Sequence, residues 1–139
     1  MAALLNPYLS FKDTCRAAME FYQDVFGGDL VVNTFGEYGA SDAPGADLVM
    51  HSMLTTPAGF ALMASDTPEG MEFVEGSQIT ISVSGDGDDS DAIRDYWGRL
   101  CAGGTVTMPL EKQIWGDEFG MVTDRFGIGW LVNIGGGAA

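Results

Sequence analysis

The strongest constraint on the fold is an internal repeat. Residues 13–28 and 89–104 each place apolar side chains at helical spacing and then end in two consecutive glycines. The apolar positions of the second segment follow those of the first by 75 residues. We expect Asp13 or Thr14 to cap the first helix. The aromatic pairs on the expected buried faces are Phe21/Tyr22 and Tyr96/Trp97. Such a repeat predicts two copies of one supersecondary unit.

Short apolar runs predict strands around each helix. They are residues 8–11, 30–35 and a hairpin over 48–65 in the first half, and 79–83, 105–108 and a hairpin over 119–134 in the second. The sequence therefore predicts one α+β domain, 1–139, made of two βαβββ modules at 5–66 and 77–134. One helix cannot cover both faces of a sheet, so we expect the modules to form a curved, cleft-enclosing mixed sheet.

The charge balance excludes several kinds of partner. Asp and Glu number 20 against six Lys and Arg, which gives a net charge of −14. This charge repels phosphate backbones and anionic lipids, so we expect no nucleic acid and no membrane as partner. No stretch is long and apolar enough to span a membrane, and the start of the chain lacks a signal-peptide pattern.

The two cysteines, Cys15 and Cys101, are too few for a disulfide framework. We therefore expect a reduced, cytoplasmic protein. Cys15 stands at the start of the first predicted helix, where the helix dipole can lower the pKa of a thiol. The chain offers no surrounding His and Asn constellation for it, so a catalytic nucleophile is not expected.

Four side chains are candidates for a ligand site. His51 is the only histidine and falls on a predicted strand, where it is an acid–base group, a hydrogen-bond donor or a solvated strand residue. Tyr8 on the first strand either donates into the cleft or packs in the core. Trp115 in a loop and Phe119 beside it could form an aromatic wall. Trp130, inside a strand, is expected to belong to the core.

The paired βαβββ design resembles the vicinal oxygen chelate superfamily over essentially the whole chain. That superfamily includes glyoxalase I, bleomycin-resistance proteins and extradiol dioxygenases. The segments PYLSF, AAMEFYQDVFGG, VMHSML followed by GFALMASD, and WGDEFGMVTDRFGIGW resemble its PhnB-like subgroup. The resemblance implies a small-molecule site in the cleft and a homodimer, because relatives commonly pair two chains.

Metal-using members take four ligands from the first and last strands of the two halves. Carried over, these places hold Asn6, Gln78, an aliphatic at Ala61 or Leu62, and Leu131. Amides are weak ligands and aliphatic side chains cannot ligate, so we expect no metal and no cofactor. Gln78 remains a candidate for contact with a ligand.

The sequence thus favours a small-molecule-binding protein of the glyoxalase/bleomycin-resistance type without the usual metal ligands. Two alternatives stay open: a metal-dependent lyase, isomerase or dioxygenase of the same superfamily, and a metal-free enzyme using His51 as its acid–base group. The expected ligand-binding residues are Tyr8, His51, Gln78, Trp115 and Phe119.

Overall fold

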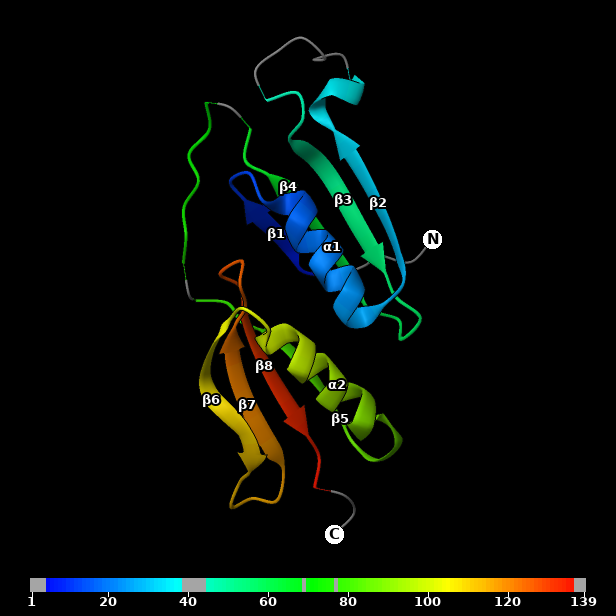
Figure 1. Ribbon diagram of the computed structural model, residues 1–139, viewed down its shortest axis with the longest axis vertical. Helices are drawn as coiled ribbons and strands as arrows, with labels where there is room; N and C mark the ends of the chain where they lie inside the picture. Colours follow the sequence, from blue (N-terminus) through cyan, green and yellow to red (C-terminus); the bar gives the residue numbers. More distant parts are fainter. Residues whose placement is uncertain (1–4, 39–44, 69, 77, 137–139) are drawn as a thin grey trace. The chain divides into compact units, whose positions relative to one another are not determined.

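A computed structural model describes residues 5–38, 45–68, 70–76 and 78–136. The chain divides into two compact units, Met1–Glu75 and Gly76–Ala139 (Figure 1). The first unit contains β1 (Tyr8–Phe11), α1 (Cys15–Phe26), β2 (Asp29–Thr34), the short 3-10 helix η1 (Phe35–Tyr38), β3 (Val49–Thr55) and β4 (Ala61–Asp66). The second contains β5 (Ile81–Gly85), the short 3-10 helix η2 (Gly87–Asp89), α2 (Ser90–Cys101), β6 (Thr105–Lys112), β7 (Glu118–Thr123) and β8 (Gly129–Ile134). Residue 77, the expected start of the second module, lies outside the described residues.

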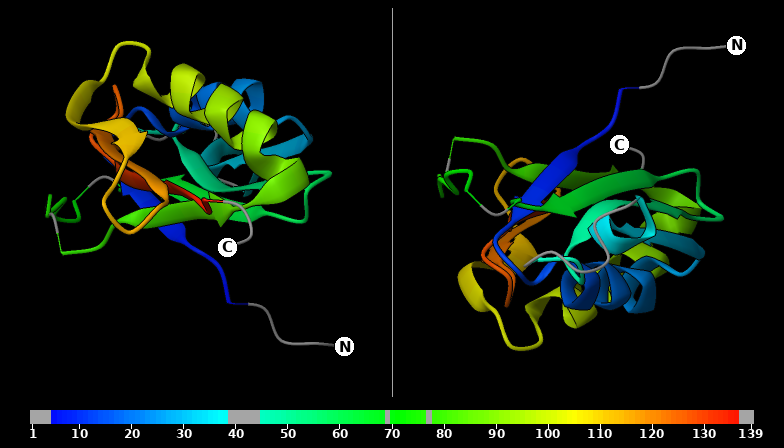
Figure 2. Two further views of the ribbon diagram at one scale, coloured as in Figure 1. Left: turned by 90° about the horizontal axis from the view of Figure 1, so that it is seen from below. Right: turned by 90° about the horizontal axis from the view of Figure 1, so that it is seen from above.

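Each unit is a four-stranded mixed sheet with one α-helix, which confirms the α+β class and the βαβββ order. The strand orders are β1-β4-β3-β2 and β5-β8-β7-β6. The last strand of each unit is therefore internal, parallel to the first strand and antiparallel to the third. Figure 2 shows α1 and α2 each lying against one face of its own sheet.

The two helices bury different amounts of side chain. Cys15, Ala18, Met19, Tyr22, Val25 and Phe26 of α1 are buried. In α2 only Ile93 and Leu100 are buried, whereas Tyr96 and Trp97 are half-buried. Trp97 of the expected aromatic face does pack on the sheet: it lies over Gly120 of β7, where an added Cβ would come within 2.8 Å of the indole. A glycine on the sheet therefore makes room for the aromatic ring.

The two hairpins share one turn geometry. The Thr56 hydroxyl accepts the Phe60 N–H at 2.9 Å, and Asp124 Oδ1 accepts the Ile128 N–H at 3.1 Å. Gly59 and Gly127 hold the corresponding left-handed positions, with φ of 92° and 90°. The hairpin predicted over 119–134 is therefore confirmed, and the Asp124 side chain is part of its turn.

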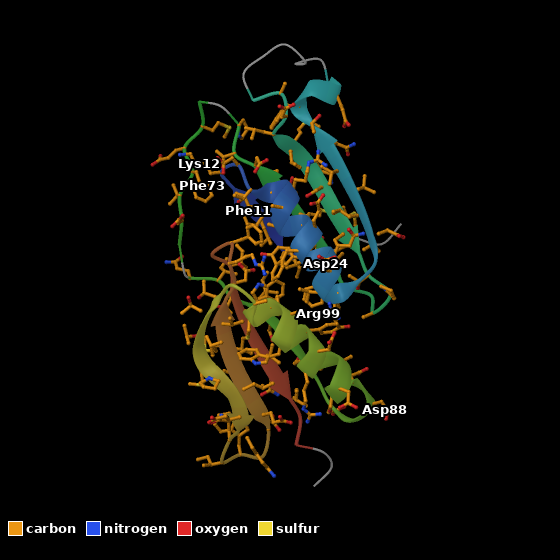
Figure 3. All side chains as sticks on the ribbon, viewed as in Figure 1. Phe11, Lys12, Asp24, Phe73, Asp88 and Arg99 are labelled. Carbon is orange, nitrogen blue, oxygen red and sulfur yellow. The ribbon has the colours of Figure 1, made fainter. Side chains whose placement is uncertain are left out.

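A buried carboxylate ties the first unit together. Asp66 at the end of β4 is 3% exposed, and its two oxygens accept the N–H groups of Cys15 and Val49, both at 2.9 Å. Thr14 occupies the N-cap position, as one of the two expected caps, but makes no side-chain hydrogen bond there; the Asp66 carboxylate instead accepts the N–H of Cys15. A buried donor left without an acceptor costs about 1–3 kcal/mol, so this carboxylate fixes α1 on its sheet. Phe11, its neighbour on β1, lies beside α1 (Figure 3).

Candidate functional site

The face of the first sheet turned away from α1 carries the candidate residues of the first unit. Leu54, Leu62 and Ala64 are buried on the side covered by the helix. Strand side chains alternate between the two faces, so Met53 and Met63, which pair across β3 and β4, belong to the opposite face. We call this the first open face. Its polar side chains include Tyr8, Ser10, Asn33, His51 and Ser65.

Tyr8 and His51 meet on the first open face. The Tyr8 hydroxyl lies 3.1 Å from His51 Nδ1, and the two rings stack with centroids 5.8 Å apart and planes at 29°. Tyr8 is 50% exposed and His51 is half-buried, so both are accessible on the surface of their unit. Tyr8 and His51, which the sequence predicts separately as ligand contacts, therefore contact each other.

The Tyr8–His51 pair offers one hydrogen-bond donor and one acceptor whichever tautomer the imidazole adopts. If the hydroxyl donates to Nδ1, then Nε2 of His51 carries the proton and donates, while the phenol oxygen accepts. If Nδ1 donates, then the hydroxyl hydrogen and the Nε2 lone pair are presented instead. A ligand with an adjacent acceptor and donor fits both arrangements.

A second polar group borders this pair on β2. Asn33 is the cross-strand neighbour of His51, and its Nδ2 lies 3.4 Å from Glu37 Oε2. The same carboxylate oxygen accepts the Thr34 N–H at 3.1 Å. The short helix η1 thus places the negatively charged carboxylate of Glu37 beside the first open face.

The candidate aromatics of the second unit occupy the equivalent place. Met53 pairs with Met63 in the first sheet, and Met121 pairs with Leu131 in the second, so Met53 and Met121 occupy equivalent places. His51 and Phe119 stand two residues before them and therefore also correspond. Phe119 contacts Trp115, with ring centroids 6.3 Å apart and planes at 68°. Each unit therefore carries an aromatic pair that includes this position, with a hydroxyl and an imidazole in the first pair and an indole N–H in the second.

The Trp115 turn is held by the C-terminal end of the chain. Asp117 accepts hydrogen bonds from Asn133 Nδ2 at 3.1 Å and from the Gly136 N–H at 2.9 Å. Trp115 nevertheless stays 61% exposed. The indole therefore projects from a turn with a fixed base.

A groove of about 490 Å³ lies in the second unit. Thr80, Thr107, Met108, Met121, Thr123 and Gly129 contribute to its lining. Trp115 and Phe119 do not line this groove, and the sequence reasoning missed Met108 as a lining residue. The strand is broken by bulges on both sides of Met108, which re-aim its side chain and which are seen only in the structure.

The places carried over from metal-using relatives do not form a donor set. Tyr8 pairs with Met63 and Ser82 pairs with Leu131, so Asn6 corresponds to Thr80, and its expected match with Gln78 is wrong. Gln78 is exposed. No group of three or more His, Cys, Asp or Glu side chains that could hold a metal ion lies among the described residues. Amide and aliphatic groups at these places do not fit a transition metal.

Cys15 is buried rather than activated. Its side chain is 0% exposed, and its Sγ lies 3.5 Å from the Ser52 hydroxyl. Burial, the largest cause, raises the pKa of the Cys15 thiol to about 11. Burial thus acts against the lowering of the pKa that a helix terminus can cause.

Comparison with known proteins places this arrangement in a family. Residues 4–132 match the Glyoxalase/Bleomycin resistance protein/Dioxygenase superfamily. The chain is 26% identical to protein YjdN of Escherichia coli K12 over 94% of each chain. The crystal structure of PA1353 from Pseudomonas aeruginosa is similar with a TM-score of 0.83 and 35% identity, over 96% of this chain and 98% of that one.

The fold is also shared with the PhnB protein of Bacillus cereus, at a TM-score of 0.75 and 20% identity over 95% of this chain and 99% of that one. The chain therefore belongs to the glyoxalase/bleomycin-resistance/dioxygenase superfamily, also called the vicinal oxygen chelate superfamily. Within the described residues, none of the helices has the length and apolar character needed to traverse a lipid bilayer.

Trp115 and Trp130 should respond differently to truncation. Trp130 is 1% exposed and its Nε1 donates to Asp124 Oδ2 at 2.8 Å, so Trp130→Ala is expected to cost about 3–5 kcal/mol of unfolding free energy. Trp115→Ala removes a largely exposed ring and should cost less than about 1 kcal/mol. Urea unfolding of both variants measures the difference. Equal losses would show that Trp115 is a core residue.

Proposed function

We propose that this chain is a small-molecule-binding protein of the glyoxalase/bleomycin-resistance type. It acts as one domain of two modules, 5–66 and 77–134, and holds its ligand on the open faces of the sheets. The contact between Tyr8 and His51 carries this proposal, because it joins a flat aromatic surface to a donor and an acceptor. Gln78, Trp115 and Phe119 are proposed as further contacts.

The charge of the chain limits the ligand. None of the four strands of the first sheet contains Lys or Arg, and Glu37 adds a carboxylate beside the open face. The whole chain carries a net charge of −14. A negative field repels anions, so the expected ligand is neutral or cationic, flat, and equipped with an adjacent hydrogen-bond acceptor and donor. We propose that binding needs neither a metal nor another cofactor, and that the protein works in the cytoplasm.

Variants of the Tyr8–His51 pair test this function. A thermal-shift screen of metabolites and antibiotics first identifies compounds that raise the melting temperature. Tyr8→Phe keeps the ring and removes the hydroxyl. It should lower the affinity for those compounds by about two- to tenfold, the effect of one hydrogen bond. His51→Phe introduces the residue that the second sheet has at the equivalent place. It should lower the affinity for the same compounds at least as much. Isothermal titration calorimetry measures both.

Tyr96→Phe is the matched control, because it removes a hydroxyl from α2 rather than from the open face. It should leave the affinity unchanged. A screen without any stabilising compound would contradict the proposal. Compounds that bind the Tyr8 and His51 variants as tightly as the native protein would contradict it as well.

The same pair favours one alternative, a metal-free enzyme. A tyrosine within 3.1 Å of an imidazole nitrogen can relay a proton, which is the arrangement that general acid–base catalysis requires. Proton NMR of each bound compound during incubation distinguishes the two functions. Conversion that stops in His51→Phe would assign the enzyme, whereas an unchanged spectrum agrees with binding alone.

We also propose that the protein acts as a homodimer. β2 and β6 lie at the edges of their sheets and carry exposed apolar side chains, Val31 at 58% and Val106 at 44% exposure. Like charges of −14 on each chain oppose association, so added salt should strengthen the dimer by screening. Light scattering at micromolar concentration should give twice the mass of the chain. A monomer in both low and high salt would contradict the dimer.

A further inference from the structure

The edge strand β6 of the second sheet is exposed even on the side that carries the helix. α1 packs mainly against β2, β3 and β4 and so reaches the edge strand of its sheet, whereas α2 packs mainly against β5, β8 and β7 and stops short of β6. Val106 pairs with Val122, which is buried two residues after the glycine that lies under Trp97, so Val106 points to the same side as α2. It is nevertheless 44% exposed.

Two half-buried apolar residues continue this exposed surface toward α2. Leu110 precedes Glu111, whose cross-strand partner Phe119 lies on the open face, so Leu110 points to the side of the helix. Trp97 of α2 covers the glycine of β7 beside which the Leu110 backbone also lies. Both residues are half-buried. We call Val106, Leu110 and Trp97 the α2–β6 strip.

The charges of the elements that carry the α2–β6 strip balance. α2 has two aspartates and two arginines, and β6 has one glutamate and one lysine, so each element has a net charge of zero. The whole chain carries −14. The other edge strand, β2, contains Asp29 and no cation, and Glu37 follows it in η1. A second chain of the same charge is therefore repelled less at the strip than at β2.

We propose that the α2–β6 strip is the surface through which two copies of this chain associate. The inference rests on the homodimer proposed above and names its interface. A basic partner is attracted most strongly to the acidic parts of the surface. An apolar strip between elements of balanced charge instead fits a partner with the same excess of acid, which is a second copy. Trp97 supplies the kind of side chain that contributes most at the centre of interfaces.

The free edge of β6 determines how the two copies meet. Pro109 lies within β6 and has no N–H to donate, and the pairing of β6 with β7 shifts register on both sides of Met108. Such interruptions prevent a further strand from adding to an edge. The two copies therefore pack through the side chains of the strip and do not form one continuous sheet.

Val106→Glu tests the α2–β6 strip. It places a carboxylate among apolar side chains in both copies, so the dissociation constant of the dimer should rise by about tenfold or more. Val31→Glu is the matched control, because Val31 is exposed on the edge strand of the first sheet and the change adds the same charge. It should shift the constant by less than about twofold, since charges beyond a Debye length are screened. Sedimentation equilibrium measures both variants.

Lys112→Glu tests the balance of charge at a fully solvated position that leaves the core untouched. Lys112 is exposed, and the change leaves two glutamates on β6. The variant should raise the dissociation constant by about two- to fivefold at low salt and by less at high salt. Lys12→Glu makes the same change of charge on the exposed segment between β1 and α1 (Figure 3). It should shift the constant less than Lys112→Glu does.

The outcomes separate this interface from the proposed function. A native dimer that Val106→Glu leaves intact, or that Val106→Glu and Val31→Glu weaken equally, would overturn the inference while the homodimer stands. Equal shifts in Lys112→Glu and Lys12→Glu would also overturn it. A native chain that is monomeric at both low and high salt would overturn the homodimer and its interface together.

Discussion

A single helix for each four-stranded sheet is the constraint on which the rest of the structure depends. α1 and α2 each cover one face of their sheet, and Asp66 fixes α1 there by accepting two buried N–H groups. The first and second strands of each unit lie at opposite edges of their sheet and run parallel, so the helix that connects them must cross one face of that sheet. The face of each sheet opposite its helix is the one to which we assign ligand binding.

The two open faces have diverged within one geometry. His51 and Phe119 stand at equivalent places, yet His51 meets a tyrosine hydroxyl whereas Phe119 meets an indole ring. The first unit thus offers a hydroxyl and an imidazole, and the second offers an indole and the groove lined in part by Met108 and Met121. A duplicated module can keep one fold and still present two kinds of surface, because the side chains on the open face contribute little to the core.

The repeat, the hairpin turns and the burial of Trp130 could be predicted because helical spacing, glycine punctuation and strand alternation are local signals. Contacts between residues far apart in the sequence could not be predicted from these local signals. Asp66 caps a helix 51 residues earlier in the chain, and Tyr8 reaches His51 across 43 residues. The Asn6–Gln78 match failed because the register of a parallel pair is set by its neighbouring strand, which the spacing of the repeat does not report.

The central claim is that the open faces bind ligands while the helix-covered faces only hold the fold. NMR of protein labelled with carbon-13 in its methionine methyl groups tests it most directly, because methionines lie on both kinds of face. Met53, Met63 and Met121 are half-buried on the open faces, whereas Met19 is fully buried in α1. Compounds from the thermal-shift screen should move at least one open-face signal and leave Met19 in place. A shift at Met19 with all three open-face signals unmoved would contradict the account.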